Sequence, residues 1–244
     1  MGRSLIGGLL LALCAVLAGC GAGSTTGPVG ASSEPSTLTQ SPASPLSPSA
    51  QPKTLDAADL KKGLVTARDL GAPWIQPKAV NTSGSKGELC PGHRSATTKL
   101  RSTAAAEANF TEGKGTGKNI ATFRLSTLPG PDSSALKAAY AVDQQVCGKY
   151  RDAAGFYVVR STEGPTSVTN ADELVTSWSE RIYYDKSQKK LAYARHYLIT
   201  RTGQLVTYFS YAFLTTEKDP SAKDFTRASD LLAVQLKKNA KVFS

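Results

Sequence analysis

The sequence predicts an α+β fold, a curved antiparallel sheet with packed helices, and three observations predict it. Stretches typical of strands crowd the second half of the chain and follow one another by short turns, an order that pairs strands antiparallel. Stretches typical of helices stand before, between and after them. The 244 residues are 40% hydrophobic, enough for a packed core. We expect one domain over residues 54–244, because no repeat or second linker divides them.

Two short helices open this domain. Asp56 can cap a helix that carries Leu60, and Thr66 can begin a second helix that stops at Gly71. Residues 74–80 then look extended.

The middle of the domain contains a segment of mixed composition, a strand pattern and a helix pattern. Residues 98–110 are small and mixed, and their propensities allow a helix. Residues 119–128 alternate between apolar and polar side chains, the pattern of a strand with one apolar face. The next helix begins at Pro131 and ends at Gly148. The residues expected near one side of it are Leu136, Ala139, Tyr140, Val146 and Cys147.

The region that follows is dominated by strand patterns. Residues 155–161 contain a short aromatic and β-branched run, typical of a buried strand. Residues 174–184 alternate, which places Leu174, Trp178 and Glu180 on one face of a long strand.

A hairpin and a helix complete the chain. Residues 191–199 and 205–214 predict two strands joined by a two-residue loop at Thr202 and Gly203. That loop sets three cross-strand pairs: Tyr197 with Tyr208, Arg195 with Ser210, and His196 with Phe209. A helix opened by residues 219–221 ends in a basic turn. Its apolar positions at helical spacing are Phe225, Ala228, Leu232 and Leu236.

The first twenty residues have the pattern of a bacterial lipoprotein signal peptide. Arg3 supplies a positive charge, and residues 5–18 are almost wholly apolar but shorter than the ~20 residues of a membrane-spanning helix. Residues 17–20, Leu-Ala-Gly-Cys, look like a lipobox, in which cleavage precedes a cysteine that carries diacylglycerol. We expect loss of residues 1–19 and an extracytoplasmic chain anchored to the cell membrane through Cys20. A conventional signal peptide is the alternative.

Residues 20–53 predict a lipidated cysteine followed by a disordered tether. Of residues 21–53, 22 are Gly, Pro, Ser or Thr and none is aromatic. Such a segment buries too little apolar surface to offset its ordering entropy. We expect it to hold the folded domain away from the membrane.

Two cysteines remain for the exported domain. Cys14 leaves with the signal peptide and Cys20 is consumed by lipid, which leaves Cys90 and Cys147. Two thiols in an oxidising compartment predict one disulfide. A catalytic thiol is the alternative, but neither cysteine lies in a CxxC pair.

The sequence predicts no catalytic residue, no cofactor and no metal site. It contains no GxSxG, HExxH or GxxxxGK[ST] motif and no cysteine or histidine cluster with metal-ligand spacing. His196 lies within a strand, where a packed or satisfied side chain is more common than a base. We read the glycine-rich residues 113–118 as a loop between two strands rather than a phosphate site.

Aromatic and polar side chains share the long strands and form the candidate ligand-binding set. Its members are Trp178, Glu180, Arg195, Tyr197 and Tyr208. On an open face they would give a cationic and aromatic surface suited to an anionic or carbohydrate-like ligand. Beneath a helix, the same residues would be core.

The positive charge of the chain suggests further partners. Lys and Arg number 29 against 19 Asp and Glu, a formal net charge of +10. No nucleic-acid-binding motif is present, so we expect no nucleic-acid partner. Anionic envelope polymers and lipid headgroups are available partners outside the cell, although a dispersed, solvated surface explains the same lysines.

These features together support a family resemblance. The lipobox, the tether, the Asp-Leu-Gly-Ala-Pro-Trp turn at residues 69–74, the positions of Cys90 and Cys147 and the closing amphipathic helix resemble actinobacterial surface lipoproteins related to the extracellular sensor domain of PknH-type kinases. The resemblance covers residues 55–243. It implies an antiparallel sheet that forms a cleft for an unidentified ligand, with no catalytic residues.

The leading functional hypothesis is a non-enzymatic, lipid-anchored envelope protein whose domain binds a ligand or partner. Two alternatives come from other classes of protein. One is an envelope enzyme whose residues come from distant positions and form no motif. The other is a structural or adaptor lipoprotein that docks another envelope protein.

Overall fold

The computed structural model describes residues 54–77, 90, 102–113, 119–128, 133–152, 154–162, 164–165, 167–213 and 222–243. The signal peptide, Cys20 and the tether, predicted over residues 1–53, lie outside these residues. So do parts of other predicted segments, namely residues 78–80, 98–101, 114–118, 131–132, 214 and 219–221.

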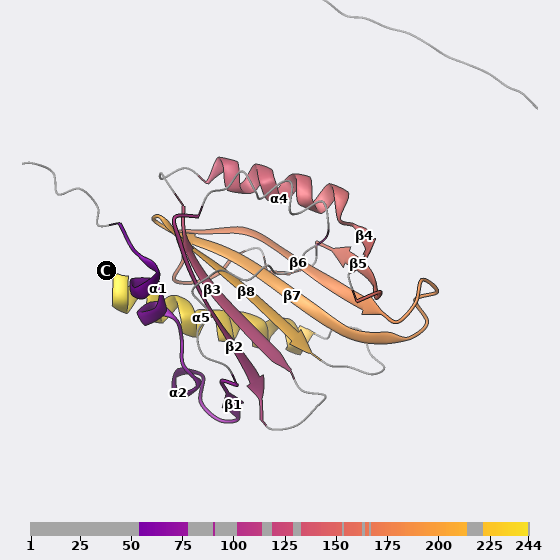
Figure 1. Cartoon of the computed structure of the whole chain (residues 1–244), viewed down its shortest axis with the longest axis horizontal. Coiled ribbons are helices and arrows are strands. Elements are labelled where there is room, and N and C mark those ends of the chain that lie inside the picture. The colour runs from indigo at the N-terminus through magenta and orange to yellow at the C-terminus, as the bar shows by residue number, and fades with distance from the viewer. Residues whose placement is uncertain are drawn as a thin grey trace, which may run out of the picture. The chain divides into compact units, whose positions relative to one another are not determined.

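The described strands form one antiparallel sheet of eight strands, as the predicted fold class requires (Figure 1). In chain order they are β1 Trp74–Ile75, β2 Ala104–Glu112, β3 Ile120–Thr127, β4 Lys149–Arg151, β5 Tyr157–Ser161, β6 Glu173–Tyr183, β7 Leu191–Thr202 and β8 Leu205–Phe213. Their order across the sheet is β1-β2-β3-β8-β7-β6-β5-β4. Every pair of neighbours is antiparallel.

Helices cover both faces of the sheet (Figure 1). They are α1 Ala57–Gly63, α2 Ala67–Leu70, α4 Ser134–Val146 and α5 Ala222–Phe243. Helix α4 packs over one face, here called the α4 face, and helices α1 and α5 pack over the opposite face, the α5 face. Within the described part of the chain, no helix is both long and apolar enough to cross a membrane.

The two predicted N-terminal helices are confirmed, and their predicted caps are present. The backbone N–H of Asp59 donates to Asp56 Oδ1 at 2.8 Å. Thr66 and Asp69 form a capping box at the start of α2, and Gly71 ends that helix with a φ of 75°. These caps satisfy N–H groups that a helix start leaves without partners, so residues close in sequence determine both helices.

The larger core lies on the α5 face. Helix α5 contributes Leu232 and Leu236 at the predicted spacing, and α1 contributes Leu60. The large aromatic side chains that they meet are Phe110, Phe123, Phe209 and Tyr211. A smaller core lies beneath α4 and consists of Leu136, Tyr140, Trp178, Ile199 and Val206.

The propensities of residues 98–110 allow a helix, but the structure forms strand β2 over Ala104–Glu112. Its alanines alternate: Ala106 and Ala108 are buried against the core of the α5 face and Glu107 lies on the α4 face. Alanine has a high helix propensity, but pairing with β3 from Ala104 to Thr111 decides the structure here.

The hairpin of β7 and β8 is confirmed, but its register differs from the predicted one by two residues. Gly203 and Gln204 form the loop, with φ at 58° for Gly203, and Thr202 pairs with Leu205. Consequently Tyr197 lies opposite Ser210, Arg195 opposite Ala212 and His196 opposite Tyr211. A shift of two residues leaves every side chain on its predicted face.

Two predicted face assignments are wrong. An irregularity in β6 between Leu174 and Thr176 moves Leu174 to the core of the α5 face, whereas Trp178 lies beneath α4. On α4, Val146 is 56% exposed and Asp143 takes the buried position instead. A carboxylate on the inner side of a helix requires a partner, which the next section identifies.

Candidate functional site

The structure brings the five predicted ligand-binding residues to the α4 face. Trp178 and Tyr197 are cross-strand partners on β6 and β7, as are Glu180 and Arg195. Tyr208 on β8 lies opposite Ile199, next to Tyr197 on the same face. The shared face follows from the two-residue repeat of each strand.

The aromatic members of this set lie under α4. Trp178 is 1% exposed and stacks on Tyr197, with ring centroids 4.6 Å apart and planes at 17°. Tyr140 of α4 lies 5.8 Å from Trp178 and 6.4 Å from Tyr208. These rings therefore hold α4 on the sheet.

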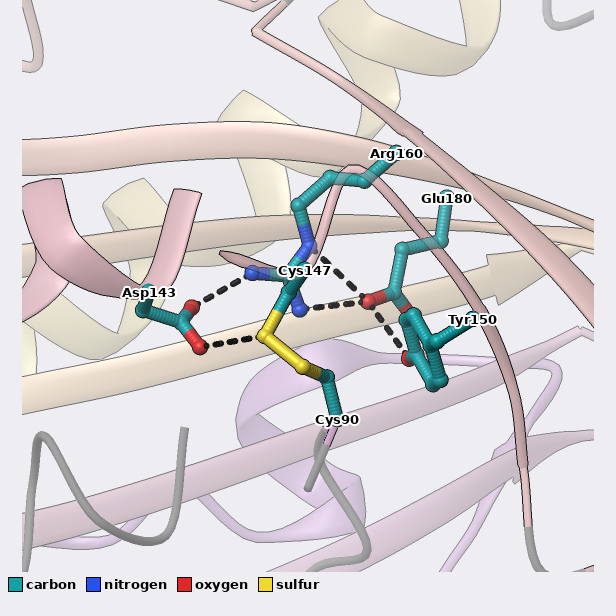
Figure 2. The surroundings of a disulfide bond; sticks show 6 residues. All are labelled: Cys90, Asp143, Cys147, Tyr150, Arg160 and Glu180. Carbon is teal, nitrogen blue, oxygen red and sulfur yellow. Dashed lines mark hydrogen bonds and ion pairs between the residues drawn. A yellow bond between two sulfur atoms is a disulfide. The ribbon is translucent and has the colours of Figure 1, made fainter. Parts of the chain in front are cut away.

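Figure 2 shows a buried ion-pair cluster, whose guanidinium lies 4.8 Å from the ring centroid of Trp178. Arg160 of β5 pairs with Asp143 of α4 and with Glu180 of β6. Its Nη2 and Nε donate to Glu180 Oε1 at 2.8 and 3.2 Å. The side chains of all three residues are at most 2% exposed. One guanidinium thus compensates two buried carboxylates and ties α4 to the sheet.

Sequence reasoning missed Asp143 and Arg160. Asp143 lies three residues after Tyr140 and seven after Leu136, on the apolar side of its helix. Arg160 lies two residues after Val158 on β5, so the two side chains point to the same face of the sheet. Charged residues at core-facing positions are the signal that could have found both.

The predicted disulfide is present and lies beside this cluster (Figure 2). Cys90 and Cys147 are joined, with Cα atoms 5.7 Å apart, and both are buried. Asp143 Oδ1 lies 3.0 Å from Cys147 Sγ. The disulfide leaves neither sulfur as a thiolate, so these three side chains do not form a metal site.

A pocket opens on the α4 face at the β4 end of the sheet. Its volume is ≈ 290 Å³. It is lined by Tyr150, Asp152, Ala154, Val158, Glu180, Ile182, Tyr193 and Arg195. Two of the predicted residues, Glu180 and Arg195, therefore belong to a pocket wall.

Phenol groups surround the charges of the pocket. Arg195 donates to Tyr197 Oη at 2.6 Å and to Tyr193 Oη at 3.2 Å. Tyr150 Oη donates to Glu180 Oε1 at 3.0 Å. Burial raises the pKa of Tyr150, Tyr193 and Tyr197 above the usual range of tyrosine, so these phenols keep their protons at neutral pH.

Arg195 has an unusual set of neighbours for a half-buried cation. Among the residues that the structure describes, no carboxylate forms an ion pair with it. Its guanidinium lies over the rings of Tyr193 and Tyr197, 5.5 and 5.6 Å from their centroids. The N–H groups that the phenols do not occupy are available to a ligand.

Comparisons with known proteins give few matches. No protein-family model and no curated protein matches the chain. Among solved structures it is similar to the extracellular domain of PknH from Mycobacterium tuberculosis, with 8% identity and a TM-score of 0.48, over 77% of this chain and 100% of that chain. It is also similar to an uncharacterised protein (Rv0999 ortholog) from Mycobacterium smegmatis, with 12% identity and a TM-score of 0.31, over 70% of this chain and 80% of that chain.

The first of these neighbours is the extracellular domain to which the sequence resemblance points. What the pocket can bind depends on its own residues.

His196 lies away from this pocket, in the α5-face layer. It is 1% exposed, its Nδ1 lies 2.9 Å from Ser179 Oγ, and Phe225 packs edge-on against its ring. Its Nε2 is buried without a hydrogen-bond partner among the described residues. Burial lowers the pKa of His196 to about 4. The imidazole is therefore neutral in the folded protein.

This burial predicts a pH dependence of stability. Because the pKa of His196 falls from 6.5 to about 4 on folding, the unfolded chain binds the proton more tightly. The contribution of the neutral imidazole to the free energy of unfolding is fully present above pH 6.5. It is lost as the pH falls toward 4, by about 3 kcal/mol in total. Urea unfolding of the wild type and of His196→Gln across this range measures it. The difference between the two should shrink with falling pH; a constant difference contradicts the prediction.

Proposed function

We propose that residues 54–244 form a non-enzymatic domain that binds a small polar ligand in the pocket between β4 and β7, held at the membrane by lipid on Cys20. The observation that supports it most directly is the setting of Arg195, a cation at a pocket wall held by two phenols instead of by a carboxylate. A guanidinium with free N–H groups in a partly desolvated pocket favours an anionic or hydroxyl-rich ligand group.

The rest of the pocket supports binding. Ile182 and Val158 supply apolar walls, and Tyr193 supplies an aromatic face. Concave sites of this kind combine apolar walls with a few polar groups that orient a ligand. Glu180 already accepts hydrogen bonds from Arg160 and Tyr150 on Oε1, which fixes its position. A carboxylate held in one position can orient a bound ligand.

Removal of the Arg195 charge is expected to weaken ligand binding at least about ten-fold, since a hydrogen bond to a charged group contributes ~1.5–3 kcal/mol. The measurement is calorimetric titration of the full-length chain in detergent with a panel of glucuronate, glycerol phosphate, inositol phosphate, neutral hexoses and α-amino acids. Arg195→Gln is compared with the wild type for each compound that binds.

Arg68→Gln is the matched control, because Arg68 is exposed on α2 and the charge change is identical. It should bind as the wild type does. A panel in which no compound binds the wild type, or equal affinities for Arg195→Gln, would contradict the proposed site.

The lipid anchor has its own test. Metabolic labelling with a fatty-acid analogue is expected to mark the wild type and leave Cys20→Ser unmarked, because lipid is attached to that sulfur. Two or more acyl chains make membrane attachment stable, since each buried CH₂ contributes ~0.8 kcal/mol. The variant should accumulate unprocessed or in the medium. Equal labelling of the two proteins would show that Cys20 is not lipidated.

A further inference from the structure

The charged side chains that line the pocket restrict the charge of the ligand that it can bind. Two carboxylates, Asp152 and Glu180, and one guanidinium, Arg195, line it. Arg160 lies behind Glu180, but it also pairs with Asp143. A purely anionic ligand that reaches Arg195 would therefore meet two carboxylates, and a purely cationic ligand would meet Arg195.

Glu180 keeps one oxygen for a ligand. Its Oε1 accepts from Arg160 Nε, Arg160 Nη2 and Tyr150 Oη. No described residue donates to Oε2, although Glu180 is only 2% exposed and lines the pocket. The second oxygen of a carboxylate that lines the pocket can accept a hydrogen bond, so it favours a ligand that brings a donor.

The positive charge of the pocket, on Arg195, lies on the strand next to that of Glu180. Glu180 and Arg195 are direct cross-strand partners, and such partners have Cβ atoms about 4.5–5.5 Å apart. Yet they form no ion pair with each other, because Glu180 turns toward Arg160 and Arg195 toward Tyr193 and Tyr197. The Oε2 of Glu180 and the Arg195 N–H groups that the phenols do not occupy thus belong to neighbouring strands of the same pocket wall.

We infer, on the basis of the proposed function, that the ligand is a small zwitterion of the α-amino-acid type. Its ammonium group contacts Glu180 Oε2, and its carboxylate contacts Arg195. The hydroxyl of Tyr193, whose oxygen accepts from Arg195, has a proton to donate to the same carboxylate. A volume of ≈ 290 Å³ suits a ligand of this size.

The test uses the wild-type full-length chain and matched compounds. Free L- and D-α-amino acids are titrated calorimetrically beside their N-acetyl and methyl ester derivatives. Each derivative removes one of the two charges. We expect both to bind at least about ten-fold more weakly than the parent compound, because each loses a charge-assisted hydrogen bond.

Variants identify the side chain that binds the ammonium group of the ligand. Glu180→Gln should lower the affinity for the free amino acid at least about ten-fold and leave that for the N-acetyl derivative unchanged. Glu173→Gln is the control on the same strand, because Glu173 pairs with Lys137 and does not line the pocket. Should Glu180→Gln fail to fold, the derivative series on the wild type decides the question.

The outcomes separate this inference from the function on which it rests. N-acetyl derivatives that bind as tightly as their parents overturn the zwitterion, and so does binding of only sugars or simple anions. In both cases ligand binding at Arg195 stands. Absence of any binding across the amino acids, sugars and phosphates overturns both.

Discussion

Arg160→Met is expected to lower the free energy of unfolding by about 3–5 kcal/mol, one of the two largest effects predicted for this domain. The substitution leaves Asp143 and Glu180 as buried carboxylates without their shared cation. It also removes the guanidinium 4.8 Å from the ring centroid of Trp178. Urea unfolding, followed by circular dichroism, measures the loss.

Two controls assign this effect to the buried cluster. Arg227→Met removes a half-exposed partner of Glu112, and the expected cost is at most about 1 kcal/mol. Adding Asp143→Asn and Glu180→Gln to Arg160→Met should recover part of the stability, because the uncompensated charges are then gone. A loss below about 1 kcal/mol for Arg160→Met alone would show that the cluster does not stabilise the fold.

Reduction of the Cys90–Cys147 disulfide is the second large effect. The two cysteines are 57 residues apart in sequence, and the chain-entropy model assigns ~4 kcal/mol to a loop of that length. The midpoint of thermal unfolding should fall by roughly 10 °C, at ~2–4 °C per kcal/mol for a domain of this size. Differential scanning calorimetry with and without reductant measures the shift.

The double variant Cys90→Ser with Cys147→Ser separates the bond from other effects of reductant. Its midpoint should match that of the reduced wild type and should not change when reductant is added. Intact-mass analysis of the native wild type after alkylation should find neither thiol modified. Two alkylated cysteines in the native protein would contradict the bond.

The candidate site was only partly accessible from sequence. The shared face of Glu180, Arg195 and Tyr197 could be predicted because alternation along a strand survives a register shift of two residues. The pocket could not, because Tyr150 and Asp152 come from β4 and the residue that follows it. That strand is three residues long and has no distinct pattern.

The five predicted ligand-binding residues differ in their surroundings, and no strand pattern could predict this difference. Trp178 and Glu180 are two residues apart on β6 and point to the same face. Helix α4 covers Trp178, whereas Glu180 lies past that packing and lines the pocket. The path of α4 depends on Asp143 meeting Arg160 and on Cys147 meeting Cys90, contacts between residues far apart in the chain.

By itself, the sequence determined the elements whose stabilising contacts are local. The caps at Asp56 and Thr66, the alternation over β3 and the helical spacing of α5 repeat at intervals of a few residues, so they can be read along the chain. Only the tertiary structure decided that residues 104–112 form a strand, that Leu174 and Trp178 face opposite cores, and that a pocket opens beside Arg195. Each of these depends on what distant segments place next to a residue, and neither propensity nor periodicity contains that information.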